Sequence, residues 1–372
     1  KVYIFDMENM LYEVDVHTLE FTKLYQDPIP GYHGKGGFTS QGKVVVSNNG
    51  ETSGRLDQPE HWKVSTDYRT KRGPEDRGAL ATYDGKNWEV IERRQYTEVI
   101  GPQGVHPTQE GADQPVWAIG WDKRSLRLQV MEDGSFTTFL LPKACLNNDA
   151  RHGWFTEWPR IRDIGEQDLL MDMHGMFFRF PKNFTATNSS GIAPIGSHLR
   201  YIPDFTEWNG KLVIATDEGS VQGNPFTGQP QSNLWFGEFE DLKKWGPRTA
   251  AGSIYMEDAI EAGVPSDPFL INGFPRRMVH LASDLPVAFQ LQIDRTGNGI
   301  FEDYKRIEVD GYASHSFPSD LDAQWIRVQA DRDCEATVSF HFSEDTYRDS
   351  SDAELFSAIA QHDDPSVLAA LV

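Results

Sequence analysis

A short block of sequence recurs along the chain and limits the folds that this protein can adopt. Residues 38–51 resemble residues 205–218, and Phe155-Thr-Glu-Trp158 recurs as Phe205-Thr-Glu-Trp208. Both long blocks begin with an aromatic residue and threonine, then continue through a Gly-Lys turn, an apolar strand and a polar turn. Repeats of about 40–50 residues with several strands each are typical of the blades of a β-propeller.

Alternation of apolar and polar residues predicts strands along most of the chain, for example at residues 2–5, 43–46, 126–130 and 287–293. Helical patterns are confined to residues 239–245, 256–262 and 352–371. We therefore predict an all-β fold, a seven-bladed propeller over residues 1–345. Its N- and C-terminal strands would close one blade, and residues 346–372 would form a short, partly helical tail. Two stacked β-domains are the structural alternative.

Length and charge restrict the function classes. The 372 residues exceed the ~250–300 at which one conventional core stops growing, which favours a closed ring or two domains. The net charge of -21 disfavours nucleic acids and anionic membranes as partners. No apolar run approaches the ~20 residues of a membrane span, and the N-terminus reads as a strand rather than a signal peptide. We expect a secreted or periplasmic protein whose targeting segment was removed or never existed.

The two cysteines, Cys145 and Cys334, lie far apart and form no Cys-x-x-Cys unit, which excludes a cysteine-based zinc site. Whether they are free thiols or form one bridge stays open. Asp294-Arg-Thr-Gly-Asn-Gly299 begins like a calcium loop, but the twelfth position, where a bidentate acid is needed, is Lys305. A glycine-rich hairpin turn is the better interpretation of this segment.

Four histidines are expected on one face of the propeller, near its axis. His33, His152 and His198 precede predicted innermost strands, and His174 falls in a turn between the second and third strands of a blade. Histidine suits proton transfer near neutral pH and metal binding. The alternative is that these imidazoles only cap turns through hydrogen bonds.

A metal site is a further hypothesis from the same histidines. His152 and His198, with Asp172, Asp204 and Asp217 nearby in sequence, could hold one divalent ion in the axial channel. Three imidazoles would favour zinc, and a carboxylate-rich site would favour calcium. The alternative is a water-filled channel lined by hydrogen-bonded histidines. No other cofactor is required.

Arg160 and Arg162 alternate along a predicted inner strand, so both side chains are expected on the same side. Two guanidinium groups facing the channel could bind a carboxylate. An ion-pair network with Asp163 or Glu166 is the alternative. Tyr201 sits at the equivalent place one blade on and could be a general acid or a core residue.

Several motifs together resemble a known group of enzymes. They are Gly31-Tyr-His-Gly-Lys-Gly36, Ser47-Asn-Asn-Gly-Glu51, His152-Gly-Trp154 with Glu157-Trp-Pro-Arg-Ile-Arg162, Met173-His-Gly-Met176 and Gln229-Pro-Gln-Ser-Asn-Leu-Trp235. With them, most of residues 1–345 resembles the seven-bladed propeller enzymes of glycoside hydrolase family 145 and the related uronate lyases. Those lyases are the ulvan lyases of polysaccharide lyase family 25 and the rhamnose–glucuronate lyases.

The resemblance implies a reaction and roles for residues. In the lyase relatives a histidine removes the proton next to the uronate carboxylate, a tyrosine or second histidine assists, and arginine or histidine neutralises the acid. His33 and His174 resemble those histidines, and Tyr201 would serve the leaving oxygen. Asn48 and Asn49 occupy a turn where relatives carry another histidine, and asparagine can orient a sugar but cannot act as a base.

In the glycoside hydrolase relatives the active site lies on the opposite face and depends on a histidine near the chain start. Here that position falls on His17 or on Gln26. The resulting hypothesis is an enzyme that cleaves an acidic, uronic-acid-containing glycan by β-elimination or by release of rhamnose; the alternative is a non-catalytic glycan-binding propeller. The expected substrate-binding residues are Arg160, Arg162, Trp158, Asn48, Asn49, Lys35, His17 and Gln26.

Overall fold

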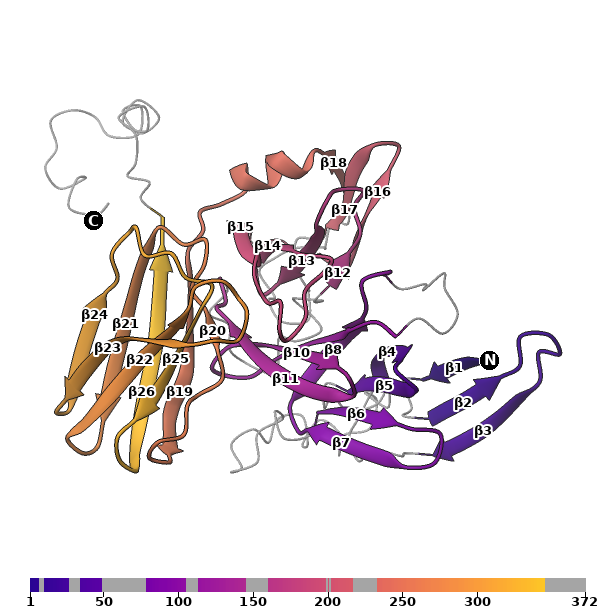
Figure 1. The fold of residues 1–372 in the computed structure, drawn as a ribbon. Helices are drawn as coiled ribbons and strands as arrows, with labels where there is room; N and C mark the ends of the chain where they lie inside the picture. The colour runs from indigo at the N-terminus through magenta and orange to yellow at the C-terminus, as the bar shows by residue number, and fades with distance from the viewer. Residues whose placement is uncertain are drawn as a thin grey trace, which may run out of the picture.

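The computed structural model describes residues 1–6, 10–26, 34–48, 78–104, 113–144, 160–198, 200, 202–216 and 233–344 (Figure 1). Five groups of consecutive antiparallel strands follow one another along the first part of the chain; four are separate sheets, and the third is half of an eight-stranded sheet. The first sheet holds β1 (Val2–Phe5), β2 (Met10–Val14) and β3 (Phe21–Gln26). The second holds β4 (Gly34–Ser40), β5 (Lys43–Asn48), β6 (Ala79–Tyr83) and β7 (Trp88–Glu92).

The next three sheets repeat the pattern. The third contains β8 (Gln95–Ile100), β9 (Val116–Trp121), β10 (Leu126–Glu132) and β11 (Ser135–Leu141). The fourth contains β12 (Arg160–Arg162), β13 (Leu169–Met173), β14 (Met176–Phe180) and β15 (Ala193–Ser197). The fifth contains β16 (Phe205–Trp208), β17 (Lys211–Thr216) and β18 (Asn233–Gly237), and the 3-10 helix η3 (Phe239–Lys244) follows it.

These sheets stack face to face in chain order. In β5, Val44 and Val46 pack with Leu11 of the first sheet, whereas Val45, which points to the other face, packs with Tyr96 of the third. The fourth sheet likewise divides its apolar residues between a core shared with the third sheet and a core shared with the fifth. Serial stacking of small antiparallel sheets is how propeller blades pack, so the prediction of an all-β propeller is confirmed.

Residues 250–343 form two sheets that face each other. One sheet has the order β19 (Ala250–Ile260), β26 (Cys334–Ser343), β21 (Arg276–Ser283), β24 (Tyr312–Ser316). The other is the second half of the eight-stranded sheet, in the order β23 (Glu302–Val309), β22 (Val287–Asp294), β25 (Trp325–Ala330), β20 (Phe269–Leu270).

The strands in this region pair out of chain order, and Phe269 stacks on Phe340 of the facing sheet with ring centroids 4.7 Å apart. The arrangement is a β-sandwich (left in Figure 1), whereas the prediction of one propeller over residues 1–345 placed these strands in blades. The third blade sheet continues into the sandwich because Leu140 of β11 pairs with Phe269 of β20.

Tight two-residue turns explain the sequence repeat. Gln41-Gly42, Asp133-Gly134, His174-Gly175 and Asn209-Gly210 each combine two positive φ angles, between 48° and 77°, and each joins two paired strands. Positive φ at both central residues defines the hairpin turn that matches the strand twist, and it requires glycine at the second position. Gln41-Gly42 and Asn209-Gly210 occupy the same place in the two recurring blocks, which confirms that the blocks are equivalent.

The helical predictions have mixed outcomes. Residues 239–244 form η3, as the pattern predicted, and residues 352–371 lie outside the described part of the chain. The helix predicted at residues 256–262 is wrong, because most of this segment belongs to β19. The pairing of β19 with β26 shifts register between Tyr255 and Asp258, and Glu257 has a φ of 55°. These irregularities interrupt the alternation and imitate a helical spacing.

No helix in the described ranges is long and apolar enough to cross a membrane. Cys334 is buried at the start of β26, and burial raises the pKa of its thiol. Its possible partner, Cys145, lies outside the described residues.

The glycine-rich turn predicted after residue 294 is confirmed. The buried Asp294 carboxylate accepts hydrogen bonds from the backbone N–H groups of Thr296, Gly297 and Gly299, at 3.1, 2.8 and 2.8 Å. Its oxygens therefore organise the turn itself.

We expect Asp294→Ala to lower the free energy of unfolding by about 3 kcal/mol, because these amides would lose a charged acceptor in a buried place. Urea denaturation at pH 7 measures the change. Asp294→Asn, which keeps one oxygen acceptor, should lose less, and the exposed Asp310→Ala should lose nothing measurable. Equal stability of Asp294→Ala and Asp310→Ala would contradict this role.

Candidate functional site

The first strands of the second, third and fourth sheets lie next to one another. β8 contacts both β4 and β12. At Gly36 the approach of β4 to β8 is so close that a Cβ atom would lie 2.5 Å from the Val99 backbone nitrogen and 2.8 Å from the Thr97 oxygen. Only glycine fits at this position, so β4 and β8 pack backbone to backbone. Polar side chains on these inner strands are therefore brought together from distant parts of the sequence.

Three of these side chains, Glu98 of β8 and Arg160 and Arg162 of β12, join Asp204 in what we call the inner-strand cluster. Glu98 contacts Arg160 Nη1 at 3.1 Å and Arg162 Nη1 at 2.5 Å. Asp204, which precedes β16, accepts hydrogen bonds from Arg162 Nη2 at 3.1 Å and lies 3.0 Å from Arg162 Nε. Arg160 Nε lies 3.4 Å from the same aspartate. Two guanidinium groups thus share two carboxylates.

The strand geometry explains this arrangement. Ile161 lies between the two arginines and is buried in the core toward the third sheet, so Arg160 and Arg162 both point the other way, as the sequence predicted. The ion-pair alternative named Asp163 and Glu166 as partners. The structure instead supplies Glu98 and Asp204, and Asp163 binds Lys182 at 2.9 Å.

Burial raises the pKa of Glu98, and the charges of Arg162 and Arg160 counteract only part of that rise. Burial also acts on Arg162, but the charges of Glu98 and Asp204 outweigh it and raise the pKa of the guanidinium. The side chain of Asp204 is 51% exposed, whereas that of Glu98 is 10% exposed. The cluster thus has a buried side, formed by Glu98, and an open side, formed by Asp204.

His198 lies beside this cluster, and both of its ring nitrogens are hydrogen-bonded. Its Nε2 is 2.8 Å from Asp172 Oδ1, its Nδ1 is 3.0 Å from the backbone oxygen of Arg200, and its ring packs on Phe177 at 4.5 Å. Asp172 pairs across the sheet with Arg160. Both ring nitrogens of His198 are hydrogen-bonded to oxygen atoms, so neither is free to act as a metal ligand in this arrangement.

His174 occupies the predicted turn, between β13 and β14. It is buried, adopts a left-handed backbone (φ 48°), and its ring centroid lies 5.4 Å from that of Trp121. Histidine is among the residues enriched in this conformation, so the turn itself accounts for part of its presence.

The other predicted site residues are spread more widely. Asn48 is buried at the end of β5 and pairs with Gly34, the neighbour of Lys35 on β4. His17 is exposed in the turn between β2 and β3, where Asp15 Oδ1 accepts its backbone N–H at 2.9 Å. Gln26 ends β3. The predicted residues that lie outside the described part of the chain are His33, Asn49, His152, Trp158 and Tyr201.

Only part of the predicted metal site lies within the described residues. They contain no group of three or more His, Cys, Asp or Glu side chains that could hold an ion. Of the two predicted ligands, His152 is outside the described ranges and His198 uses both nitrogens in hydrogen bonds.

No protein-family model and no curated protein matches this chain. Among solved structures, it is similar to sucrose-6-phosphate hydrolase from Lactobacillus gasseri, with 10% identity over 90% of this chain and 84% of that one, at a TM-score of 0.23. A glycoside hydrolase family 43 arabinoxylan arabinofuranohydrolase from Bacillus subtilis shares 9% identity over 91% of this chain and 60% of that one, at a TM-score of 0.18. Similarities this weak carry no argument about function.

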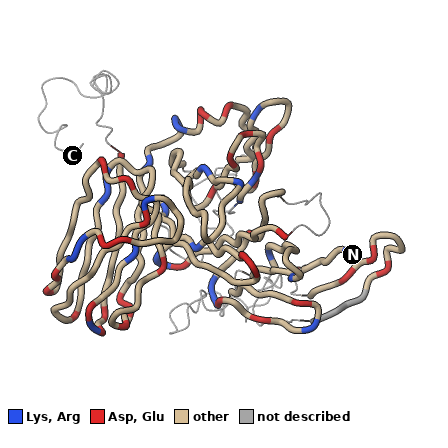
Figure 2. Tube along the Cα trace, viewed as in Figure 1, with Lys and Arg blue, Asp and Glu red and all other residues tan. Residues whose placement is uncertain are grey.

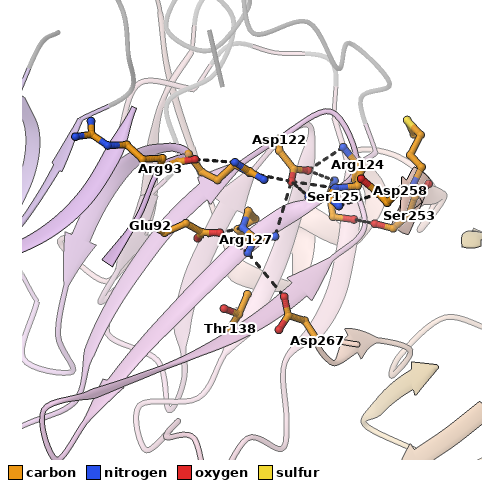
Figure 3. Close-up of polar contacts among 12 residues, drawn as sticks. Glu92, Arg93, Asp122, Arg124, Ser125, Arg127, Thr138, Ser253, Asp258 and Asp267 are labelled. Atoms are coloured by element: carbon orange, nitrogen blue, oxygen red, sulfur yellow. Dashed lines mark hydrogen bonds and ion pairs between the residues drawn. The ribbon is translucent and has the colours of Figure 1, made fainter. Parts of the chain in front are cut away.

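A second polar group, which we call the junction network, lies where the third sheet meets the sandwich (Figure 3). Arg127 Nη2 contacts Glu92 at 2.6 Å and Asp267 at 3.8 Å. Arg124 contacts Asp122 at 3.1 Å and Asp258 at 2.9 Å. The Arg127–Asp267 and Arg124–Asp258 contacts each join the two parts of the molecule.

Burial tends to raise the pKa of Glu92, but the charge of Arg127 and hydrogen bonds from Tyr96 and Gln129 outweigh burial and hold it below the ordinary 4.5. Glu92 therefore stabilises the fold above about pH 4.5, and this contribution is lost as the pH falls through the folded-state pKa.

We expect Glu92→Gln to lower the free energy of unfolding by about 2 kcal/mol at pH 7, with the deficit shrinking toward pH 3. Urea denaturation repeated across this pH range tests the prediction. Glu89→Gln on the same strand, whose carboxylate is 67% exposed, is the matched control and should match the wild type throughout. A deficit that does not depend on pH would refute the assigned charge.

Proposed function

We propose that this protein is a carbohydrate-active enzyme that cleaves a uronic-acid-containing glycan at the inner-strand cluster. The observation that carries the proposal is the pair of guanidinium groups on β12 that share Asp204 on the open side of the cluster. A uronate carboxylate has the charge and planar shape of the Asp204 side chain, so it can take the place of Asp204 on both arginines. The sequence resemblance to propeller uronate lyases and family 145 hydrolases supports the glycan class.

Elimination follows from this binding mode. Arg160 and Arg162 neutralise the uronate carboxylate, which makes the neighbouring C5 proton more acidic. His33 or His174 takes that proton, the C5–H electrons form the C4–C5 double bond, and the C4–O bond breaks. The leaving oxygen receives a proton from Tyr201 or from water. The products are a shortened glycan and an unsaturated uronate.

The buried carboxyl group supports hydrolysis by the same cluster, with release of rhamnose. A carboxyl group whose pKa is raised by burial can donate a proton to a glycosidic oxygen, and Glu98 is such a group. Asp204, which contacts the same guanidinium as Glu98, would be the second carboxylate in this mode, which differs from elimination because Asp204 stays on the arginines.

Glycan binding without cleavage is the second candidate. It is favoured by the charge balance of the inner-strand cluster, in which two arginines are already neutralised by two carboxylates. The described histidines near the cluster also favour binding alone, because His198 is hydrogen-bonded and His174 is buried.

Incubation with rhamnosyl-glucuronate glycans and ulvan tests the proposal. Elimination gives ultraviolet-absorbing unsaturated uronates, and hydrolysis gives free rhamnose. Arg160→Gln should reduce kcat/KM by about 100-fold, whereas the exposed Arg306→Gln should retain activity. Calorimetric binding without turnover across a broad uronate panel would establish the second candidate, and neither binding nor turnover would overturn both.

A further inference from the structure

A cleft of about 570 Å³ lies away from the inner strands, between the fourth sheet, η3 and the start of the sandwich. Arg179 of β14, Lys243 of η3, Arg248, Asn272 and Glu344 supply its polar lining. Ala193, Pro194 and Ile195 of β15 supply an apolar wall. This volume is in the range of small-molecule binding sites, about 300–1,000 Å³.

The charge of the lining is opposite to that of the protein. Three cations face one carboxylate in the cleft, although the chain as a whole carries a net charge of -21. Acidic and basic residues are interspersed along the described chain (Figure 2), so this local excess of positive charge differs from the pattern along the rest of the chain. At contact distance these local charges dominate, because salt screens the distant acidic groups.

One of the cations is held rigidly. Arg248 Nε lies 2.5 Å from Glu344 Oε1, and its Nη1 donates to the backbone oxygen of Gly273 at 3.1 Å. Arg179 and Lys243 are therefore the two cations in the cleft that can reorient toward a ligand.

Among the described residues, the partners of Arg179 and Lys243 are weak or exposed. Arg179 Nε is 3.7 Å from Asp168, beyond hydrogen-bond distance, and its guanidinium lies over the Phe239 ring at 5.9 Å. Lys243 pairs with Glu240 on η3, and both side chains are more than half exposed. Exposed pairs of this kind contribute little energy, so an anionic ligand can compete for both cations.

The remaining lining suits a hydroxylated ligand. Asn272 Nδ2 donates to the backbone oxygen of Ile192 at 3.0 Å, which leaves its side-chain oxygen to accept from a hydroxyl group. The apolar wall of β15 can pack against the carbon face of a sugar ring.

We propose that this cleft binds an anionic saccharide, with Arg179 and Lys243 contacting carboxylate or sulfate groups and Asn272 contacting a hydroxyl group. The site shares no residue with the inner-strand cluster, so it is independent of the proposed cleavage. Together with the proposed cleavage site, on which this last step rests, the cleft would give the protein two binding sites for one glycan chain, and the cleft would hold the chain without taking part in the reaction.

Calorimetry on the full chain tests the proposal at constant ionic strength. The probes are a glucuronate oligosaccharide, a sulfated oligosaccharide, a neutral oligosaccharide of the same length, and sodium sulfate. The double variant Arg179→Gln/Lys243→Gln should weaken binding at this site by about tenfold or more. Lys244→Gln is the matched control, since Lys244 is also on η3 but does not line the cleft, and it should bind like the wild type.

Each outcome separates this proposal from the cleavage proposal. Arg160→Gln should leave binding at the cleft unchanged. If the inner-strand cluster binds no glycan, the wild-type protein should still show one binding event, and that event should depend on Arg179 and Lys243. Preference for the glucuronate or for the sulfated probe identifies the anionic group. Wild-type binding by the correctly folded double variant overturns the proposal, as does equal affinity for the neutral oligosaccharide or for sodium sulfate alone.

Discussion

Replacing Arg162 with alanine is expected to lower the free energy of unfolding by about 3–5 kcal/mol. The buried Glu98 carboxylate would keep only Arg160, at 3.1 Å, and would lose its 2.5 Å contact with Arg162. An uncompensated buried charge is more costly than the loss of an ordinary contact. Urea denaturation at pH 7 measures the change.

A double-mutant cycle shows whether the effect belongs to the pair. Glu98→Gln in the Arg162→Ala background should restore part of the stability, because the buried negative charge is removed. Arg306→Gln is the control for an exposed ion pair and should change the stability by less than about 1 kcal/mol. If Arg162→Ala were no more harmful than Arg306→Gln, the cluster would not be a coupled unit.

Replacing Trp117 with alanine is also expected to lower the free energy of unfolding by about 3–5 kcal/mol. Trp117 of β9 is fully buried, its ring centroid lies 4.7 Å from that of Phe180 in the fourth sheet, and its indole N–H donates to the backbone oxygen of Phe184 at 3.0 Å. The substitution would open a cavity between two stacked sheets and remove a buried hydrogen bond.

Trp208→Ala is the matched control for this prediction, because Trp208 is 60% exposed on the fifth sheet. Its loss should cost less than about 1 kcal/mol. Thermal unfolding of both variants at the same protein concentration gives the comparison. Similar melting temperatures for the two variants would contradict the stacking of the third sheet on the fourth.

The features predicted correctly from the sequence are local ones. The repeat at Phe38 and Phe205 led to two equivalent hairpins because a two-residue turn with glycine leaves a fixed sequence signature. The turn at Asp294 was recognisable because its acceptor and its glycines are adjacent in the chain. Alternating apolar residues likewise predicted most of the strands.

The partners of Arg160 and Arg162 could not be found in this way. Glu98 is 62 residues from Arg160, and Asp204 is 42 residues from Arg162. Neither carboxylate belongs to a motif, since their positions depend on which inner strands become neighbours. The nearby Asp163 and Glu166 were more obvious candidates by sequence distance alone.

The sandwich was missed for a related reason. Strands of a blade and strands of a sandwich show the same alternation, because both bury one or two faces. Only the pairing order distinguishes them, and β19 pairs with β26 at the far end of the described chain.

The pairing of Leu140 with Phe269 also limits where the chain can be truncated and how its two parts could have been joined in evolution. Residues from β9 to β14 and residues from both sandwich sheets belong to one continuous core. A piece ending near residue 249 would lack Trp325, whose ring centroid lies 4.7 Å from that of Phe139, and would expose part of this core. The sandwich therefore differs from a domain on a flexible linker, which can be removed or exchanged alone. A recombination event that keeps this core intact would have to transfer the blade strands and the sandwich together.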